Sequence, residues 1–328
     1  MAQPNHINWG IIGCGNVTEV KSGPAFNKVE HSSLVAVMRR NGTRAADYAA
    51  RHGVPRWYDS ADALIHDPDI NAVYIATPPA QHEEYALAAM QAGKPVYVEK
   101  PMSVDVASCI RMQDAAERTG MKLCIAHYRR ALPMFLHIRQ MIAEKKIGEV
   151  RTVRISLLQP DKSSNVANTG DNWRVNPDIA GAGLFYDLAP HQLDLVQYFF
   201  GEPLETSGFS ANQAGLYQAE DVVTGMMRLP GNILFTGQWC YTVDPHLQED
   251  LFEINGSEGR IRFSVFNTQV SVMQDGKEEI LSFPPPAHIQ QPMITRVVSY
   301  FLGNGSNPCS AGDAIGSMRA MEKFAYGR

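Results

Sequence analysis

The alternation of short apolar runs with helical segments in the first 125 residues restricts the fold more than any other feature of the sequence. Five runs are rich in valine and isoleucine, and several are apolar throughout, which is typical of strands covered on both faces. The runs are INWGII (7–12), SLVAVM (33–38), NAVYIA (71–76), PVYVE (95–99) and KLCIA (122–126). Three segments between them, at 43–53, 81–93 and 103–120, have helical spacing and end in glycine. This order predicts an α/β fold with a right-handed, doubly wound parallel sheet.

The pattern changes after a predicted helix at 131–145. Strand-like runs follow, separated by turn signals such as LPGN and NGSEG. These runs lie at 150–158, 222–229, 232–239, 251–255 and 260–266. One helix at 185–201 precedes most of them, and the tail at 291–326 is helical in pattern. The second part of the chain is therefore expected to be an α+β domain with a large, mostly antiparallel open sheet.

We expect two domains, which suits a chain of 328 residues. Residues 1–125 form a predicted Rossmann domain that binds NADP. Residues 126–328 form a predicted substrate-binding and oligomerisation domain, with a C-terminal tail that can pack back on the Rossmann domain.

Composition argues against several classes of partner and compartment. The formal net charge is −5 and the sequence pI about 6.1, which gives no electrostatic basis for binding nucleic acid or an anionic membrane. The start, MAQPNHINWG, lacks the regions of a signal peptide, and no apolar run approaches the ~20 residues of a membrane span. The five cysteines are scattered and form no CxxC pair. We expect a cytoplasmic protein with reduced packing cysteines, and a reactive thiol is the alternative.

The stretch WGIIGCGNVTEV predicts a nucleotide-binding turn. Gly13 permits a tight turn, and Gly15 lets the backbone approach a pyrophosphate at a helix N-terminus. Thr18 stands where the usual fingerprint has a third glycine. An ordinary strand-to-helix turn is the alternative, but the place of this turn after the first strand favours a nucleotide site.

The end of the second predicted strand indicates the choice of cofactor. NAD sites usually have an acidic residue here, whereas this chain has Met38, Arg39 and Arg40. A carboxylate would repel a 2′-phosphate, and guanidinium groups can bind one. Two solvated arginines on a surface helix are the alternative. The sequence predicts NADP(H) in preference to NAD(H).

Two further turns are expected on the same rim of the sheet, because ligands bind beyond the carboxyl ends of parallel strands. TPP (77–79) follows one strand and EKP (99–101) follows another. Lys100 is thereby placed beside the nicotinamide, where it can donate to a substrate oxygen, and Glu99 can pair with Lys100 or another cation. A surface lysine at a strand end is the alternative.

The stretch DLAPHQLD places Asp187, His191 and Asp194 on one helix face. A histidine flanked by carboxylates is held in one orientation and suits proton transfer. Three alternatives remain open. Asp187 caps the helix, Asp194 is solvated, or the group binds a metal, although no His or Cys cluster completes a metal site.

Three stretches together resemble the glucose–fructose oxidoreductase and inositol dehydrogenase (Gfo/Idh/MocA) family over nearly the whole chain. They are GIIGCGNV, ATPPAQHEEYALAAMQAGKPVYVEKP and GAGLFYDLAPHQLDLVQYFFG. The resemblance implies a Rossmann domain followed by an α/β domain whose open sheet often forms oligomer contacts, here in a homodimer or homotetramer. It implies an NAD(P)-dependent dehydrogenase or reductase of carbohydrate metabolism that acts on CH–OH groups of sugars or polyols. Lys100, Asp187 and His191 become the implied catalytic group.

The resemblance also implies substrate contacts. GDNWRVNPDIAGAG is similar to the Trp-Arg segment of the 1,5-anhydrofructose reductase branch, which brings Trp173 and Arg174 to the substrate, although the cofactor loop is closer to generic members. HYRR (127–130) adds Tyr128 and Arg129. The predicted substrate-binding residues are Lys100, Tyr128, Arg129, Trp173, Arg174, Asp187 and His191. The predicted cofactor-binding residues are Gly13, Cys14, Gly15, Asn16, Val17, Arg39, Arg40, Thr77, Pro78, His82, Glu99 and Lys100.

The resulting hypothesis is an NADP(H)-dependent oxidoreductase that transfers hydride to or from a sugar, polyol or keto-sugar-like substrate with lysine and histidine acid–base catalysis and no metal. Two other classes stay open. One is an NADP(H)-binding sensor or scaffold with little turnover. The other is a hydrolase or lyase that uses the nucleotide only transiently.

Overall fold

The computed structural model describes residues 5–161 and 173–327, which divide into two compact units. The first unit comprises Met1–Ala131 and Pro286–Ile315, and the second comprises Leu132–Pro285 and Gly316–Arg328. The predicted domains at 1–125 and 126–328 stay predictions. Within the described ranges, no helix has both the length and the apolar character that crossing a membrane requires.

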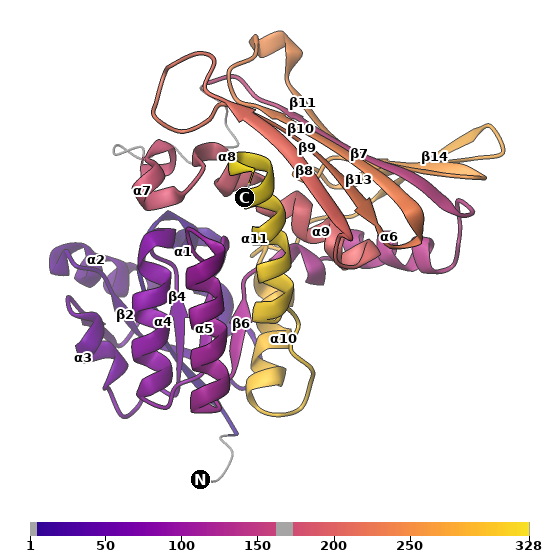
Figure 1. Cartoon of the computed structure of the whole chain (residues 1–328). Helices are drawn as coiled ribbons and strands as arrows, with labels where there is room; N and C mark the ends of the chain where they lie inside the picture. Colours follow the sequence, from indigo (N-terminus) through magenta and orange to yellow (C-terminus); the bar gives the residue numbers. More distant parts are fainter. Residues whose placement is uncertain (1–4, 162–172, 328) are drawn as a thin grey trace. The chain divides into compact units, whose positions relative to one another are not determined.

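The first unit is built on a parallel sheet of six described strands in the order β3-β2-β1-β4-β5-β6 (Figure 1). The strands are β1 (Ile7–Ile12), β2 (Ser32–Met38), β3 (Arg56–Tyr58), β4 (Ala72–Ile75), β5 (Val96–Val98) and β6 (Leu123–Ile125). The predicted doubly wound α/β fold is confirmed, and all five predicted runs are strands. The edge strand β3 was missed because its three residues are too short and too polar to show a strand pattern.

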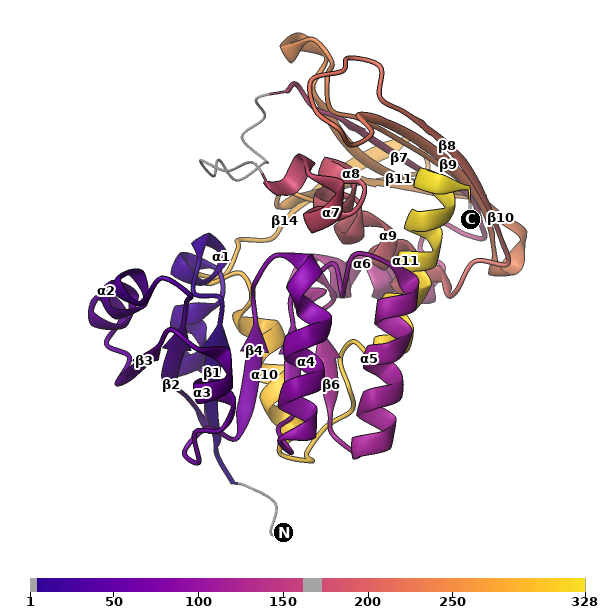
Figure 2. The same cartoon turned by 60° about the vertical axis from the view of Figure 1, so that its left-hand side comes forward.

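Helices cover both faces of this sheet. They are α1 (Asn16–Val20), α2 (Gly42–His52), α3 (Ala61–Ile65), α4 (His82–Gln91), α5 (Val106–Thr119) and α10 (Gln291–Phe301). On one face α4 and α5 lie side by side (Figures 1 and 2). On the other face the fully buried Trp9 packs against Phe26 of the 3₁₀ helix Gly23–Lys28 and against Phe301 of α10, at centroid distances of 4.8 and 5.5 Å. The late segment that carries α10 therefore belongs to the core of the first unit.

The second unit contains a sheet of eight described strands in the order β14-β13-β12-β11-β7-β10-β9-β8. The strands are β7 (Val150–Leu158), β8 (Glu205–Ala211), β9 (Val222–Leu229), β10 (Ile233–Cys240), β11 (Glu249–Gly256), β12 (Gly259–Phe263), β13 (Gln269–Gln274) and β14 (Lys277–Ser282). The predicted mostly antiparallel sheet is confirmed. One internal pair, β7 with β10, is parallel. The sequence analysis missed β8, β13 and β14, which are polar or partly exposed strands.

The second unit also contains helices. They are α6 (Pro133–Ala143), α7 (Pro177–Ala180), α8 (Gly183–Leu188), α9 (Pro190–Phe200) and, from Gly316 onward, α11 (Ala311–Tyr326). Two glycines allow α11 to approach closely, because a Cβ added at Gly208 or Gly225 would lie 2.7 or 2.4 Å from atoms of Phe324. Strands β8, β9 and β10 expose Phe209, Met226 and Leu234, respectively.

The single helix predicted at 185–201 is two helices, α8 and α9, and the predicted helical tail is likewise divided into α10 and α11. Pro190 begins α9 and has no N–H group to continue the hydrogen-bond ladder of α8. Asp187 consequently lies in the last turn of α8, and His191 lies in the first turn of α9.

Candidate active site

Three neighbouring strands of the first unit end on one rim. Ile12 of β1 pairs with Ile75 of β4, which pairs with Val98 of β5, so the turns that follow these strands start at the same level. The strand order reverses between β1 and β4, and open α/β sheets bind ligands at this reversal.

The glycine turn after β1 has the geometry that a dinucleotide site needs. Gly13 has φ +96°, and a Cβ there would lie 2.8 Å from the backbone of Thr77. A Cβ at Gly15 would meet no atom nearer than 3.9 Å, so the space beside this residue is not filled by protein. Thr18, which departs from the usual fingerprint, is fully buried and donates from Oγ1 to the Gly15 carbonyl at 2.8 Å. Thr18 therefore stabilises the glycine turn through a buried hydrogen bond.

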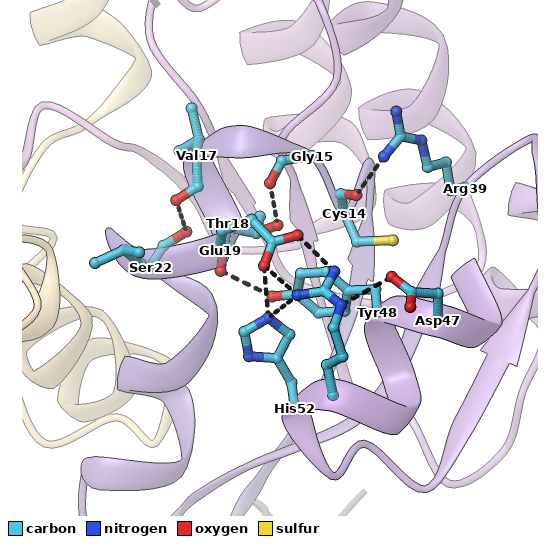
Figure 3. A network of polar contacts seen from close by, with 12 residues as sticks. Cys14, Gly15, Val17, Thr18, Glu19, Ser22, Arg39, Asp47, Tyr48 and His52 are labelled. Carbon is cyan, nitrogen blue, oxygen red and sulfur yellow. Dashed lines mark hydrogen bonds and ion pairs between the residues drawn. The ribbon is translucent and has the colours of Figure 1, made fainter. Parts of the chain in front are cut away.

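The arginine that follows β2 reaches this turn. Arg39 Nη1 donates to the Cys14 carbonyl oxygen at 3.3 Å (Figure 3), whereas Arg40 is exposed. The Cys14 side chain is buried, and burial raises its pKa to about 11, so the thiol is neutral. None of the five cysteines forms a disulfide.

A clamp of charged side chains joins α1 to α2 below the glycine turn (Figure 3). Arg51 donates from both terminal nitrogens to the two carboxylate oxygens of Glu19 at 2.8 Å, and His52 Nε2 lies 2.8 Å from Glu19 Oε2. Tyr48 donates to the Thr18 carbonyl oxygen at 2.8 Å. Hydrogen bonds from Arg51, followed in strength by that of His52, lower the pKa of Glu19 to about 2. The clamp holds the short helix α1 against its neighbour.

His82 connects the other two turns of the rim. Its Nε2 lies 2.8 Å from the Thr77 carbonyl oxygen, and its Nδ1 lies 3.0 Å from that of Pro101. The side chain is fully buried, and this burial lowers the pKa of His82, whereas the Thr77 carbonyl acts in the opposite direction. This predicted cofactor residue thus braces the turns that follow β4 and β5.

Glu99 is buried in a hydrogen-bond network directly before Lys100. It accepts from the Tyr74 hydroxyl at 2.5 Å, from Gln290 Nε2 at 2.6 Å and from the Lys100 backbone N–H at 3.1 Å. The Lys100–Pro101 peptide bond is cis. Sequence reasoning missed Tyr74 and Gln290. A tyrosine within an otherwise apolar buried strand was an available signal, since its hydroxyl needs a partner.

Tyr128 and Arg129 lie in a 3₁₀ helix, Tyr128–Ala131, soon after β6. Both are at least nine-tenths buried, and the Arg129 guanidinium lies 5.3 Å from the centroid of the Tyr128 ring. The first unit thus holds every predicted cofactor residue together with Tyr128 and Arg129.

The second unit brings Trp173, Arg174 and Asp187 together. Arg174 Nε donates to Asp187 Oδ2 at 2.9 Å, and its guanidinium lies 4.4 Å from the Trp173 ring centroid. His191 is buried with its ring edge-on to Phe266, at a centroid distance of 5.8 Å. Asp194 is 1% exposed, which contradicts the reading that it is solvated. The structure adds the Arg174–Asp187 ion pair, which the sequence did not predict.

A Rossmann sheet with a glycine turn is typical of dinucleotide-binding proteins, and here it is joined to a second unit with a large open sheet. Residues 7–127 match the family model described as "Oxidoreductase family, NAD-binding Rossmann fold", and residues 135–262 match the "GFO/IDH/MocA C-terminal domain". The chain belongs to the Gfo/Idh/MocA family of oxidoreductases, which confirms the resemblance seen in its motifs.

Relatives match nearly the whole chain. Oxidoreductase P35 of Formosa agariphila is 42% identical over 320 residues, which cover 98% of each protein. A 1,5-anhydro-D-fructose reductase of Ensifer adhaerens is 26% identical over 319 residues, which cover 94% of this chain and 92% of that one. A levoglucosan dehydrogenase, solved in complex with NADH and levoglucosan, has a TM-score of 0.85 and 23% identity over 97% of this chain and 96% of its own. That structural likeness establishes the shared fold.

Proposed function

We propose that this protein is an NADP(H)-dependent oxidoreductase that transfers hydride between the nicotinamide and a sugar, polyol or keto-sugar-like substrate. The family membership supports the reaction class. The substrate class is supported by relatives and neighbours whose names specify 1,5-anhydro-D-fructose and levoglucosan. No carboxylate directly follows β2, and Arg39 lies against the glycine turn, which is the observation that carries the cofactor preference.

The residues around the turn fit a bound dinucleotide. The space beside Gly15 leaves room for a pyrophosphate to approach the backbone. Thr77 Oγ1 is buried beside the turn and has no hydrogen-bond partner among the described residues, so it is available to a ligand. When bound, NADPH supplies the hydride.

The proposed chemistry assigns one role to each catalytic residue. Lys100 donates a hydrogen bond to the substrate oxygen, and His191 gives or takes the proton of that oxygen. Asp187 orients His191, while Arg174 fixes the Asp187 carboxylate through its bond at 2.9 Å. Acid–base assistance of this kind is typically worth about 10²–10⁴-fold in rate.

Turnover of defined substrates tests the proposal. NADPH oxidation is followed with 1,5-anhydro-D-fructose, and NADP⁺ reduction with levoglucosan, D-glucose, myo-inositol and trans-1,2-dihydrobenzene-1,2-diol. We expect turnover of at least one sugar or polyol by the wild type, and a loss of about 10²–10⁴-fold in kcat for Lys100→Met and His191→Ala. An active wild type whose two variants keep their turnover contradicts the catalytic assignment. Tight NADPH binding with no loss of the NADPH absorbance on addition of any compound favours the alternative of a sensor with little turnover.

The cofactor preference has a separate test. We expect the wild type to bind NADPH more tightly than NADH in a fluorescence titration. Arg39→Ala is expected to weaken NADPH binding about 10–100-fold, the value of a charge-assisted hydrogen bond, and to leave NADH binding nearly unchanged. The control is Arg44→Ala, an exposed arginine on α2. Equal affinities for the two nucleotides, or tighter binding of NADH, contradict the proposal.

We also propose a homodimer or homotetramer that forms through the open face of the second sheet. Phe209, Met226 and Leu234 expose 79%, 54% and 57% of their surface on three adjacent strands, and burying them against another copy is favourable. Light scattering should find a dimer or tetramer for the wild type and a smaller species for Met226→Glu. A monomeric wild type contradicts this assembly.

A further inference from the structure

Two tyrosine hydroxyls in the second unit are buried without a hydrogen-bond partner among the described residues. Tyr217 lies in the loop between β8 and β9, and Tyr241 directly follows β10. The Tyr241 side chain is completely buried. Folded proteins rarely bury a hydroxyl without a partner, because its lost hydration is not replaced. A group that costs stability in this way calls for an explanation.

Both tyrosines lie at one end of the second sheet. Cys240, the last residue of β10, pairs with Leu158 of β7 and with Val222 of β9, so the strand end before Tyr241 and the loop of Tyr217 are neighbours. The Tyr241 backbone N–H donates to the Asp221 carbonyl oxygen at 2.9 Å, which ties the two segments together.

The same loop packs against the segment that leads to Asp187. A Cβ added at Gly183, the first residue of α8, would lie 2.5 Å from the Ala219 Cβ and 3.7 Å from the Arg174 carbonyl oxygen. The loop of Tyr217, the Arg174 segment and the helix of Asp187 are therefore in direct contact. This arrangement lies within the second unit and brings together segments near residues 174, 183, 219 and 241.

Both hydroxyls remain neutral at any ordinary pH. Burial raises the pKa of Tyr217 and of Tyr241 well above the usual value, and nearby acids add to the effect, Asp221 for Tyr217 and Asp187 for Tyr241. The buried Asp221 carboxylate is already engaged, because it accepts from the Gln213 and Ala214 backbone N–H groups at 2.8 and 2.7 Å. A neutral hydroxyl both donates and accepts, which suits a partner that does the same.

We propose that the hydroxyls of Tyr217 and Tyr241 bind hydroxyl groups of the substrate beside Asp187 and select for a polyhydroxylated compound. This inference rests on the proposed function, which takes the substrate to be a sugar or polyol. A substrate with several hydroxyls satisfies both tyrosines, whereas trans-1,2-dihydrobenzene-1,2-diol keeps only one hydroxyl for them once the other is at the reacting position. Tyr217 and Tyr241 thus act as specificity residues.

Tyrosine-to-phenylalanine variants test the inference, because they remove only the hydroxyl. In the ligand-free protein, Tyr241→Phe and Tyr217→Phe should each raise Tm by about 1–3 °C, since a buried unpartnered group is lost. Each should also raise KM for the best sugar or polyol about fivefold to tenfold, the value of one neutral hydrogen bond. The Kd for NADPH should not change. The matched control is Tyr198→Phe, whose hydroxyl accepts from Arg139 at 3.0 Å, and it should neither raise Tm nor change KM.

The outcomes separate this inference from the proposed function. A wild type that turns over no sugar or polyol contradicts the proposed function, and calorimetric titration of levoglucosan into the NADPH complex then decides the inference. Levoglucosan binding that is weakened in Tyr241→Phe supports the inference, and no binding to the wild type overturns it. With an active wild type, unchanged KM in both variants overturns it. A lowered Tm in both variants also does so, because the hydroxyls would then be satisfied by bound water.

Discussion

The two units differ in how far their buried polar groups are hydrogen-bonded within the unit. At the rim of the first unit, the imidazole of His82 and the carboxylate of Glu99 have close partners within the same unit. At the sheet end of the second unit, the hydroxyls of Tyr217 and Tyr241 have no partners among the described residues, although Asp187 next to them is paired with Arg174.

The difference indicates that the two units prepare their candidate ligand-binding residues in different ways. Hydrogen bonds within the first unit fix the rim turns before any ligand binds. A preformed site of this kind suits a cofactor that is the same molecule in every turnover. In the second unit, two tyrosine hydroxyls have no hydrogen-bond partner among the described residues, which costs stability unless a ligand pairs with them, as proposed for the substrate. Substitutions that remove one polar group at a time from each unit can therefore distinguish residues that stabilise the fold from residues that bind a ligand.

The largest expected effect comes from combining one proposed catalytic residue of each unit. We expect Lys100→Met and His191→Ala each to lower kcat by about 10²–10⁴-fold. The kcat of the double variant should be little lower than that of the less active single variant. Residues that act on one substrate oxygen lose their effect together, so their losses do not multiply. The measurement is steady-state kcat for all four proteins with the best substrate.

Fully multiplicative losses would show that Lys100 and His191 act independently, which contradicts the proposal that both act on one substrate oxygen. Normal folding of the variants is checked by Tm, which should lie close to that of the wild type.

A second prediction compares one substitution in both units. Tyr74→Phe should lower the free energy of unfolding by about 2 kcal/mol, because it removes a buried hydrogen bond to the Glu99 carboxylate. Tyr241→Phe should change it in the opposite direction. Thermal unfolding of the ligand-free proteins measures both. Changes of the same sign would remove the contrast between the two units.

Most of the fold was predictable because its signals are local. Apolar runs in the first unit are buried on both faces, and runs such as 7–12 and 150–158 coincide with strands β1 and β7. Strands such as β3 and β14 were missed because exposed edge strands carry polar residues. The break at Pro190 was visible in the sequence, but helical spacing on both sides of it favoured a single helix.

The candidate site was predictable only where its residues lie in turns that directly follow strands. Gly13, Gly15 and Lys100 stand in short motifs that follow strands, so their shared rim follows from a parallel sheet. Gln290 reaches Glu99 across 191 positions. Tyr217 and Tyr241 of the second unit likewise come close only through strand pairing, which no local sequence pattern reveals.

The smallest expected effect concerns the clamp between α1 and α2. Because the folded-state pKa of Glu19 is lowered to about 2, its charge stabilises the fold above the unfolded pKa of about 4.5, and this contribution is lost as pH falls toward 2. Glu19→Gln should lower Tm by about 2 °C at pH 7, and the difference from the wild type should shrink between pH 4.5 and pH 3. Thermal unfolding across this pH range measures the difference.

Glu149→Gln is the matched control, because Glu149 pairs with Lys145 at 2.6 Å in the exposed turn between α6 and β7. Solvent screens such a pair, so the control should change Tm less at every pH. The clamp differs in having a two-pronged arginine contact and His52 on the same carboxylate. If Glu19→Gln and Glu149→Gln change Tm equally, the clamp stabilises the fold no more than an ordinary surface ion pair does. The rim turns of the first unit are then held in place by the buried partners of Glu99 and His82.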